Sequence, residues 1–190
     1  MERVIDSQSD GDPATFVPFE VLESRLTSAP PAPADTGRVR LLVARHPGGV
    51  RHTLDRVSMT PDSGMPGDSW GRQRRPSPEA QLAVMQFDVA ELVANGQPLT
   101  LFGDQMFLEL DLSDANLPAG TVLQAGSVRF EVTPMPHNGC RKFRARFGDG
   151  ALRLVSIREL RQRNLRGIYL RVIEGGDVAV GDEIRVVRRP

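Results

Sequence analysis

Cys140 is the only cysteine among 190 residues, and it lies in the run PMPHNGCRKF, directly after a strongly alternating stretch. A single thiol cannot form an intramolecular disulfide, and it cannot by itself build a cysteine-rich zinc site. It can act as a nucleophile, carry sulfur, or supply one protein thiolate to a cofactor metal. The structural alternative is a small buried side chain on the helical face that it shares with Phe143 and Phe147.

The residues next to this cysteine bear on its reactivity. Gly139 precedes it at a predicted helix start, where backbone N–H groups and the helix dipole favour a thiolate. Arg141, Lys142 and Arg144 add positive potential close by. His137, three residues upstream, could act as a general base in a Cys–His pair, or it could be a solvated histidine in a turn.

The composition excludes several classes of protein. Acidic and basic residues number 24 each, so net charge gives no argument for binding nucleic acid or a membrane. No apolar run approaches the roughly 20 residues of a transmembrane helix. The first residues, MERVIDSQSDGD, lack the basic-then-apolar pattern of a signal peptide. We therefore expect a cytoplasmic protein in a reducing setting, with neither nucleic-acid nor membrane partners.

The chain divides into two segments by composition. Residues 1–37 are mostly polar and end in the proline-rich tract 28–35, which predicts an extended linker because proline fixes φ and removes a donor. Within this extension, residues 16–26 could pack on the rest of the chain as a short helix or clamp. Residues 38–190 carry the patterned sequence and predict one domain.

From Val39 onward the pattern is mainly that of β-strands. Met106, Leu108, Leu110 and Leu112 alternate onto one face, and Ala125-Gly126 indicates a hairpin. The predicted strands are 39–43, 81–86, 106–112, 122–123, 128–132, 168–173 and 183–187. Residues 56–80 form a long loop rich in proline and glycine. Many short strands separated by turns predict a closed or nearly closed β-barrel decorated by a few short helices, mainly β and α+β overall.

The expected helices lie outside these strands. One helix begins at Asp88 as N-cap, with Glu91 as its capping-box partner, and ends at Gly96. A short helix is predicted over residues 140–147, and an arginine-rich helical region follows over 152–165. We interpret the arginines of that last region as a solvated helix face.

The C-terminal half resembles a known family. A strand ending in Glu131-Val132-Thr133-Pro134 leads to the loop cysteine, and the chain closes with Arg166-Gly167-Ile168-Tyr169, Val172, Gly175-Gly176, Val178 and Gly181-Asp182. Upstream, Leu117-Pro118-Ala119-Gly120-Thr121-Val122-Leu123 is followed by Gly126, and Gly67-Asp68 resembles a conserved "G-D" loop of the family. The pattern is similar to the MOSC domain, the C-terminal module of molybdenum cofactor sulfurases, which is also found as small stand-alone proteins. The match extends from about Val39 to Val187 and is dense from Gly103 onward.

The resemblance implies a β-barrel that binds a molybdenum–pyranopterin cofactor, with Cys140 as catalytic residue and metal ligand. Some members reduce N-hydroxylated compounds, so the resemblance implies reduction of a small N-oxygenated substrate with electrons from an external redox partner. The alternative is a non-catalytic sulfur carrier or cofactor-delivery module, in which a Cys140 persulfide passes sulfur to a partner protein. A third interpretation is a relic barrel in which the cysteine only packs.

The same resemblance assigns cofactor-binding candidates. Arg141, Lys142 and Arg166 would contact the phosphate or pterin. Gly167 would belong to the same clamp, or it would only permit a tight entry to a strand. Asp68 would contact the cofactor, or it would cap backbone amides in a turn. His137 completes the set.

The chain also departs from the family pattern. The family's "G-E-N-hydrophobic" segment appears as Gly103-Asp104-Gln105-Met106. The domain that binds pyridoxal phosphate in the full sulfurases is lacking, so sulfur could not be mobilised from cysteine by that route. A small-molecule cofactor and a redox or sulfur-transfer protein are therefore the expected partners, and exposed edge strands would allow a homodimer.

Overall fold

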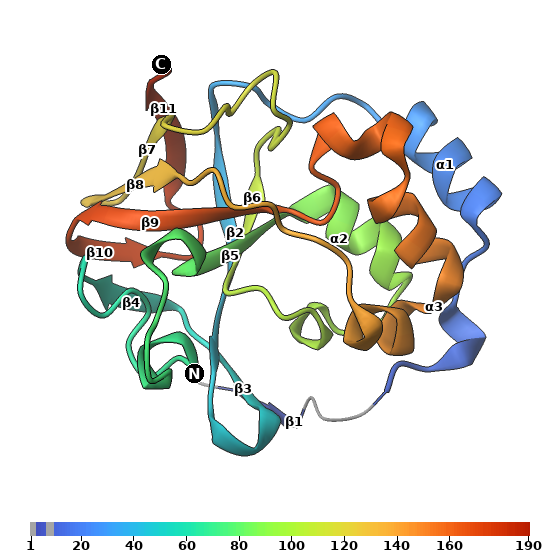
Figure 1. The fold of residues 1–190 in the computed structure, drawn as a ribbon, viewed down its shortest axis with the longest axis horizontal. Coiled ribbons are helices and arrows are strands. Elements are labelled where there is room, and N and C mark those ends of the chain that lie inside the picture. Colours follow the sequence, from blue (N-terminus) through green and yellow to red (C-terminus); the bar gives the residue numbers. More distant parts are fainter. Residues whose placement is uncertain (1–2, 7–9) are drawn as a thin grey trace.

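The protein is described by a computed structural model that covers residues 3–6 and 10–190. Seven of the described strands close into a barrel, with the helices gathered beside it (Figure 1). Around the barrel the order is β2 (Thr36–Arg45), β11 (Glu183–Arg188), β7 (Val122–Ala125), β8 (Val128–Val132), β9 (Ile168–Glu174), β5 (Leu82–Gln86) and β6 (Met106–Glu109), which pairs back to β2. Only β5 and β6 run parallel within this ring. The predicted barrel with short helices is confirmed.

The barrel interior is filled by the apolar face that the alternation predicts. Met106, Leu108, Leu110 and Leu112 are all fully buried in one cluster, although β6 itself ends at Glu109. The predicted hairpin is β7 and β8, in which Leu123 pairs with Phe130. Burying such a side chain contributes about 1.5–3 kcal/mol relative to leaving it exposed, which is why this face is the interior.

Two segments predicted as loops contain short strands. β4 (Arg56–Met59) lies inside the predicted loop 56–80, and β10 (Gly176–Ala179) lies between β9 and β11. The two strands pair antiparallel as a separate sheet, and Val57, Met59 and Val178 join the barrel core. The loop prediction was wrong here because each strand has only four residues, too few to show its alternation among glycines and prolines.

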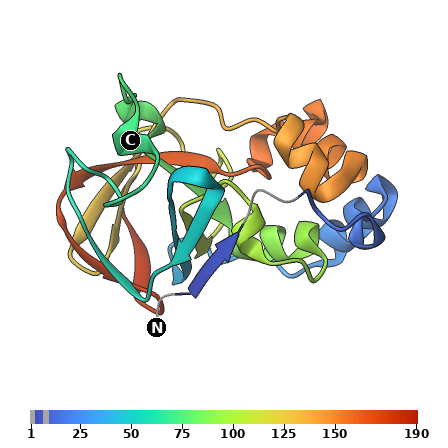
Figure 2. The ribbon, with the colours of Figure 1, turned by 90° about the horizontal axis from the view of Figure 1, so that it is seen from below.

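A further strand pair extends the sheet beyond β2. β3 (Val50–Thr53) pairs antiparallel with the end of β2, and β1 (Arg3–Asp6) pairs with β3. Figure 2 shows β1 beside β3, on the side of the barrel that faces the helices. The turn predicted at 46–49 is a short 3-10 turn, Pro47–Gly49, between β2 and β3.

Three helices form a second core against the barrel. α1 (Phe19–Ser28), α2 (Phe87–Ala94) and α3 (Arg141–Ser156) lie together on one side of the molecule (Figures 1 and 2). α1 buries Phe19, Leu22 and Leu26 in this core, so the segment predicted to pack as a short helix does so. The division of the chain at residue 37 stays a prediction.

The predicted start of α2 was wrong, whereas its predicted stop at Gly96 agrees with the structure, in which Gly96 follows the C-cap with φ 91°. Its N-cap is Gln86, which makes no side-chain capping bond, and Asp88 lies in the first turn, where its carboxylate accepts from Val89 N–H and Gln86 Nε2. At the other end Asn95, one residue before Gly96, adopts the left-handed conformation with φ 46°. The pairing of β5 with β6 and β9 sets where the helix begins, and it overrides the capping pattern.

α3 is a single element with a break inside it. Gly148 has φ 83° and ψ 177°, so the helix that begins after Cys140 ends there and a second helical segment follows to Ser156. A Cβ at Gly148 would touch the Phe16 ring, and a Cβ at Gly150 would collide with the Val17 carbonyl oxygen. The N-terminal extension therefore packs closely against the break. The arginine-rich region continues as a short 3-10 helix, Arg158–Arg163.

None of the helices in the described residues is long and apolar enough to cross a lipid bilayer.

Candidate functional site

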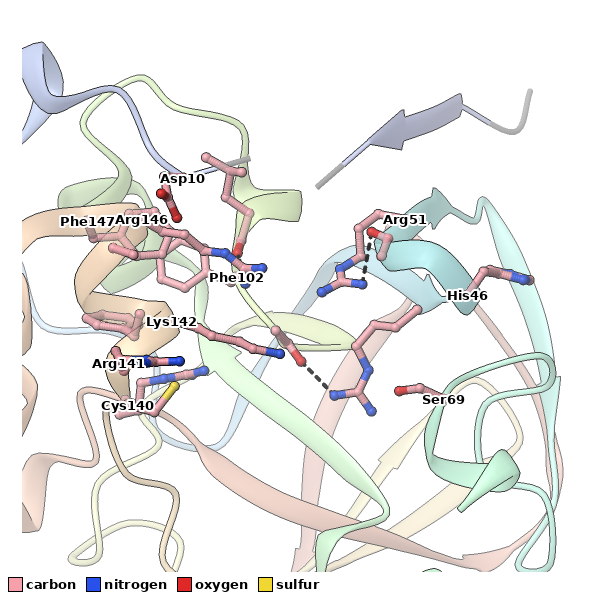
Figure 3. A pocket seen from close by; sticks show the side chains of 17 residues that line it. Asp10, His46, Arg51, Ser69, Phe102, Cys140, Arg141, Lys142, Arg146 and Phe147 are labelled. Atoms are coloured by element: carbon pink, nitrogen blue, oxygen red, sulfur yellow. Dashed lines mark hydrogen bonds between the residues drawn. The ribbon is translucent and has the colours of Figure 1, made fainter. Parts of the chain in front are cut away.

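A cleft of about 870 Å³ lies between the barrel and α3. One wall comes from the end of β2 and from β3, and the other from the first half of α3 (Figure 3). Leu101, Phe102 and Gly103 also line the cleft. The charge of the lining is strongly one-sided. The cationic side chains are Arg45, Arg51, Arg141, Lys142, Arg146 and Arg166, and among the described lining residues only Asp10 is acidic.

Cys140 lies on the α3 wall of this cleft. It is the N-cap residue of α3, with extended backbone angles, and its carbonyl oxygen accepts from Arg144 N–H at 3.0 Å. The residue is exposed, so its interpretation as a small buried side chain was wrong. Phe143 and Phe147, predicted to share its face, are buried. The Phe147 ring stacks on Phe102 at 4.1 Å (Figure 3), and the Phe143 ring is tilted against Phe102 at 6.0 Å. The aromatic packing fixes the helix, and the thiol is left accessible at its start.

Three of the predicted cofactor-binding residues line the same cleft. Arg141 and Lys142 follow Cys140 in the first turn of α3 (Figure 3). Arg166 reaches the cleft from the loop before β9, and its guanidinium lies over the Phe143 ring at 5.1 Å from the centroid. Residues from two separate segments therefore place positive charge around one thiol, as the family resemblance implies.

Arg166 is held by a buried carboxylate that the sequence reading did not select as a site residue. Asp104 is fully buried and accepts two hydrogen bonds from the Arg166 guanidinium, at 3.0 and 2.8 Å. The Arg166 side chain is 7% exposed. Both bonds come from one nitrogen, NH1, so a single charge-assisted contact to both carboxylate oxygens anchors this end of the guanidinium. Asp104 is therefore a positioning residue for one wall of the cleft.

His137 lies behind this ion pair and is not among the residues that line the cleft of Cys140. Its ring packs on Tyr169 at 4.5 Å, and its Nδ1 lies 3.6 Å from Asp104 Oδ1. The side chain is 8% exposed, so it is not a solvated loop histidine. Burial, helped by the positive charge of Arg166, lowers the pKa of His137 to about 4, against the partial opposition of Asp104.

The depressed pKa of His137 predicts a pH dependence of stability. The native state disfavours the protonated imidazole, whereas the unfolded chain binds that proton near pH 6.5. The contribution is therefore fully present above pH 6.5, and it is lost as the pH falls toward 4. We expect the free energy of unfolding to drop by about 3 kcal/mol over this window. Urea denaturation at several pH values would measure it, and a His137→Gln variant with the same slope would contradict the assignment.

Asp68 supports the opposite wall. Its carboxylate is buried and accepts from Arg45 Nε at 2.9 Å, from Arg45 NH2 at 2.7 Å and from Trp70 N–H at 2.8 Å. Burial raises the pKa of Asp68, but the hydrogen bonds and charge of Arg45 outweigh burial, and the net shift is downward. Asp68 thus caps the backbone N–H of Trp70, which is one of the two roles predicted for it, and it also orients the Arg45 side chain.

Gly167 is placed by packing. Its φ is 95°, and a Cβ there would collide with the Val84 carbonyl oxygen on the neighbouring strand β5. This geometry supports the interpretation of Gly167 as a tight entry to β9.

Several residues of the cleft were missed by the sequence reading. Arg45 and Arg51 flank the turn between β2 and β3, and Arg146 lies one helical turn and a half beyond Cys140. Nothing in the local sequence separates these arginines from others in the chain. Asp104 carried a signal, because it occupies the acidic position of the Gly103-Asp104-Gln105 segment.

Comparison with known proteins agrees with the fold and the sequence motif. A family model of the MOSC domain matches residues 71–185. The fold is similar to that of the YuaD protein from Bacillus subtilis, at 17% identity and a TM-score of 0.59, over 80% of this chain and 95% of that one. It is also similar to YiiM from Escherichia coli, at 19% identity and a TM-score of 0.51, over 80% and 71% of the two chains. At these identities the structural likeness is one of fold. No curated protein matches the sequence.

Proposed function

Because the chain belongs to the MOSC domain family, we propose that its cationic cleft binds a molybdenum–pyranopterin cofactor, with Cys140 as the protein ligand of the metal. The observation that carries this proposal is the exposed thiol of Cys140, which opens on a cleft with six cationic side chains in its lining. A metal with a soft thiolate ligand suits the sulfur, and an anionic cofactor suits the arginines.

The donor set of the structure fits such a group. Among the described residues no cluster of three or more histidine, cysteine or acidic side chains could hold a bare metal ion. A metal at Cys140 would therefore bring most of its ligands with it, as a pterin dithiolene does. Arg141, Lys142 and Arg166 would contact the pterin or its phosphate, and Asp104 would keep Arg166 in place.

Bound in this way, the cofactor would supply two-electron chemistry for a small N-oxygenated substrate. Reduction of an N-hydroxylated compound breaks the N–O bond, consumes two electrons and two protons, and releases the amine and water. The electrons would come from an external reductase, and a reducing, cytoplasmic location would keep Cys140 from being oxidised. The phenylalanines beneath the cleft would exclude water from one side of the bound molecule.

The test is elemental and pterin analysis of the protein purified from a host shown to make the cofactor. We expect about one molybdenum and one pterin per chain in the wild type, and loss of molybdenum in Cys140→Ser. The exposed Cys140 contributes little to packing, so the substitution should change the free energy of unfolding by about 0.5 kcal/mol or less. Metal-free wild-type protein from such a host would contradict the proposal.

A second candidate function is supported by the accessibility of the thiol. Cys140 is exposed at the start of α3, where another protein can reach it, as a sulfur carrier requires. Its thiolate would attack the outer sulfur of a donor persulfide, forming a Cys140 persulfide and releasing the donor thiolate. A labile sulfur that mild reductant releases from metal-free protein, and that Cys140→Ser lacks, would favour this carrier function over the enzyme.

A further inference from the structure

A second group of arginines faces the cleft at a distance from Cys140. Arg51 projects from β3, Arg45 from the end of β2, and Arg146 from α3, and Figure 3 shows Arg51 and Arg146 on opposite walls. Arg45 and Arg146 both repel Arg51 electrostatically, so the three guanidinium groups lie near one another. The cleft is therefore lined by cations well beyond the thiol.

Like Arg166, whose buried Nε also has no hydrogen-bond partner, Arg51 offers an unused donor to a ligand. It is 9% exposed, and its NH1 donates to the Gly49 carbonyl oxygen at 3.3 Å, yet its buried Nε has no hydrogen-bond partner. Burial, followed by repulsion from Arg146 and Arg45, lowers the pKa of Arg51 to about 10, so the group stays charged at neutral pH. A buried cation with an unused donor is unfavourable unless an acceptor is supplied.

The two neighbouring arginines are fixed before any ligand arrives. Arg45 uses three of the five N–H donors of a guanidinium, two of them on Asp68 and one on the Gly103 carbonyl oxygen at 2.8 Å. Arg146 donates to the Leu101 carbonyl oxygen at 2.7 Å, and the negative charge of Asp10, which also lines the cleft, acts on it. The cost of ordering these side chains is thus already met by contacts within the protein.

We propose that Arg51, with Arg45 and Arg146, forms a second anion subsite that takes a phosphate or carboxylate group of the molecule bound at Cys140. The inference rests on the proposed function for the identity of that molecule, but not for the subsite itself. Planar guanidinium groups bind such oxyanions with paired hydrogen bonds. The anion has two possible sources, the phosphate of the cofactor or an acidic substituent of the substrate.

The first arm of the test uses inorganic phosphate and protein from a host unable to make the cofactor. Isothermal titration at low ionic strength should show phosphate binding to the wild type, and Arg51→Gln should weaken it by about 10-fold or more. Arg158→Gln removes the same charge from an exposed 3-10 helix outside the cleft, so it is the matched control and should bind within about 2-fold of the wild type. Equal binding by Arg51→Gln and wild type, or an equal loss in both variants, would overturn the subsite.

A second variant protects the test against misfolding. Arg51→Lys keeps the buried charge but lacks the planar fork, so it should also bind phosphate more weakly than the wild type while remaining folded. If Arg51→Lys and Arg51→Gln both bind phosphate as tightly as the wild type, Arg51 is not the recognition group. The circular dichroism spectrum of each variant reports whether the fold is retained.

The second arm identifies the source of the anion in protein from a cofactor-producing host. If Arg51→Gln loses pterin that the wild type and Arg158→Gln retain, the subsite takes the phosphate of the cofactor. The other outcome is that Arg51→Gln retains pterin, and that phosphate binds to the cofactor-loaded wild type but not to cofactor-loaded Arg51→Gln. In that case the subsite takes an acidic group of the substrate. Wild-type protein without pterin would contradict the proposed cofactor function, and phosphate binding in the first arm would still stand.

Discussion

Replacing Asp104 with alanine is expected to lower the free energy of unfolding by about 3–5 kcal/mol. Asp104 is fully buried, and both of its carboxylate oxygens accept from Arg166, whose side chain is 7% exposed. Removing the carboxylate leaves a buried guanidinium without its counterion, and it also removes the acidic group that lies 3.6 Å from His137 Nδ1. Chemical denaturation of the wild type and the variant would measure the difference.

A double variant separates loss of a charge pair from loss of volume. Asp104→Leu combined with Arg166→Met removes both charges and restores apolar bulk, so it should recover most of the stability that Asp104→Ala loses. The double variant would nevertheless lack the arginine at the cleft and should retain less pterin. A change below about 1 kcal/mol in Asp104→Ala would show that the pair does not hold the site together.

Replacing Gly167 with alanine is expected to destabilise the fold by about 2–6 kcal/mol. Its φ of 95° would cost an alanine about 1–3 kcal/mol. The added Cβ would also collide with the Val84 carbonyl oxygen, and overpacking typically costs a further 1–3 kcal/mol. Because Val84 and Ile168 are paired between β5 and β9, the collision would separate two barrel strands next to the cleft.

Gly181 provides the matched control for the collision. Its φ is 92°, nearly that of Gly167, but a Cβ built there would meet nothing within 4 Å. Gly181→Ala should therefore show the backbone strain alone, and the excess loss in Gly167→Ala is the cost of the collision. Equal losses in the two variants, measured by denaturation under the same conditions, would mean that β5 yields without cost.

The sequence predicted those strands whose apolar residues alternate onto one buried face. The alternation from Met106 to Leu112 and the hairpin at Ala125-Gly126 were read correctly, because burial on one side of a strand leaves a trace every second residue. β4 and β10 were not, because each is short and finds its partner far along the chain. The start of α2 was misplaced because strand pairing, rather than capping, sets it.

The candidate site was predictable only in part, for a related reason. Cys140, Arg141 and Lys142 share one segment, so a motif could identify them together. Arg45 and Arg51 come from a strand pair about ninety residues away, and only the closed barrel brings that pair opposite α3. The same closure buries Asp104 behind Arg166. Long-range contacts of this kind leave no local pattern in a single sequence.

The break at Gly148 separates the part of α3 next to the thiol from the part that packs on the N-terminal residues. The segment before Gly148 begins next to Cys140. Gly148 itself packs on Phe16, and Gly150 in the following segment packs on Val17, with no room for a Cβ at either glycine. The angle at which the thiol meets the cleft is thus held from outside the barrel, by residues that composition assigns to a separate extension. A chain shortened to residues 38–190 would keep every residue proposed to bind the cofactor. It would lose Phe16 and Val17, which pack against the helix that begins at Cys140, the proposed metal ligand.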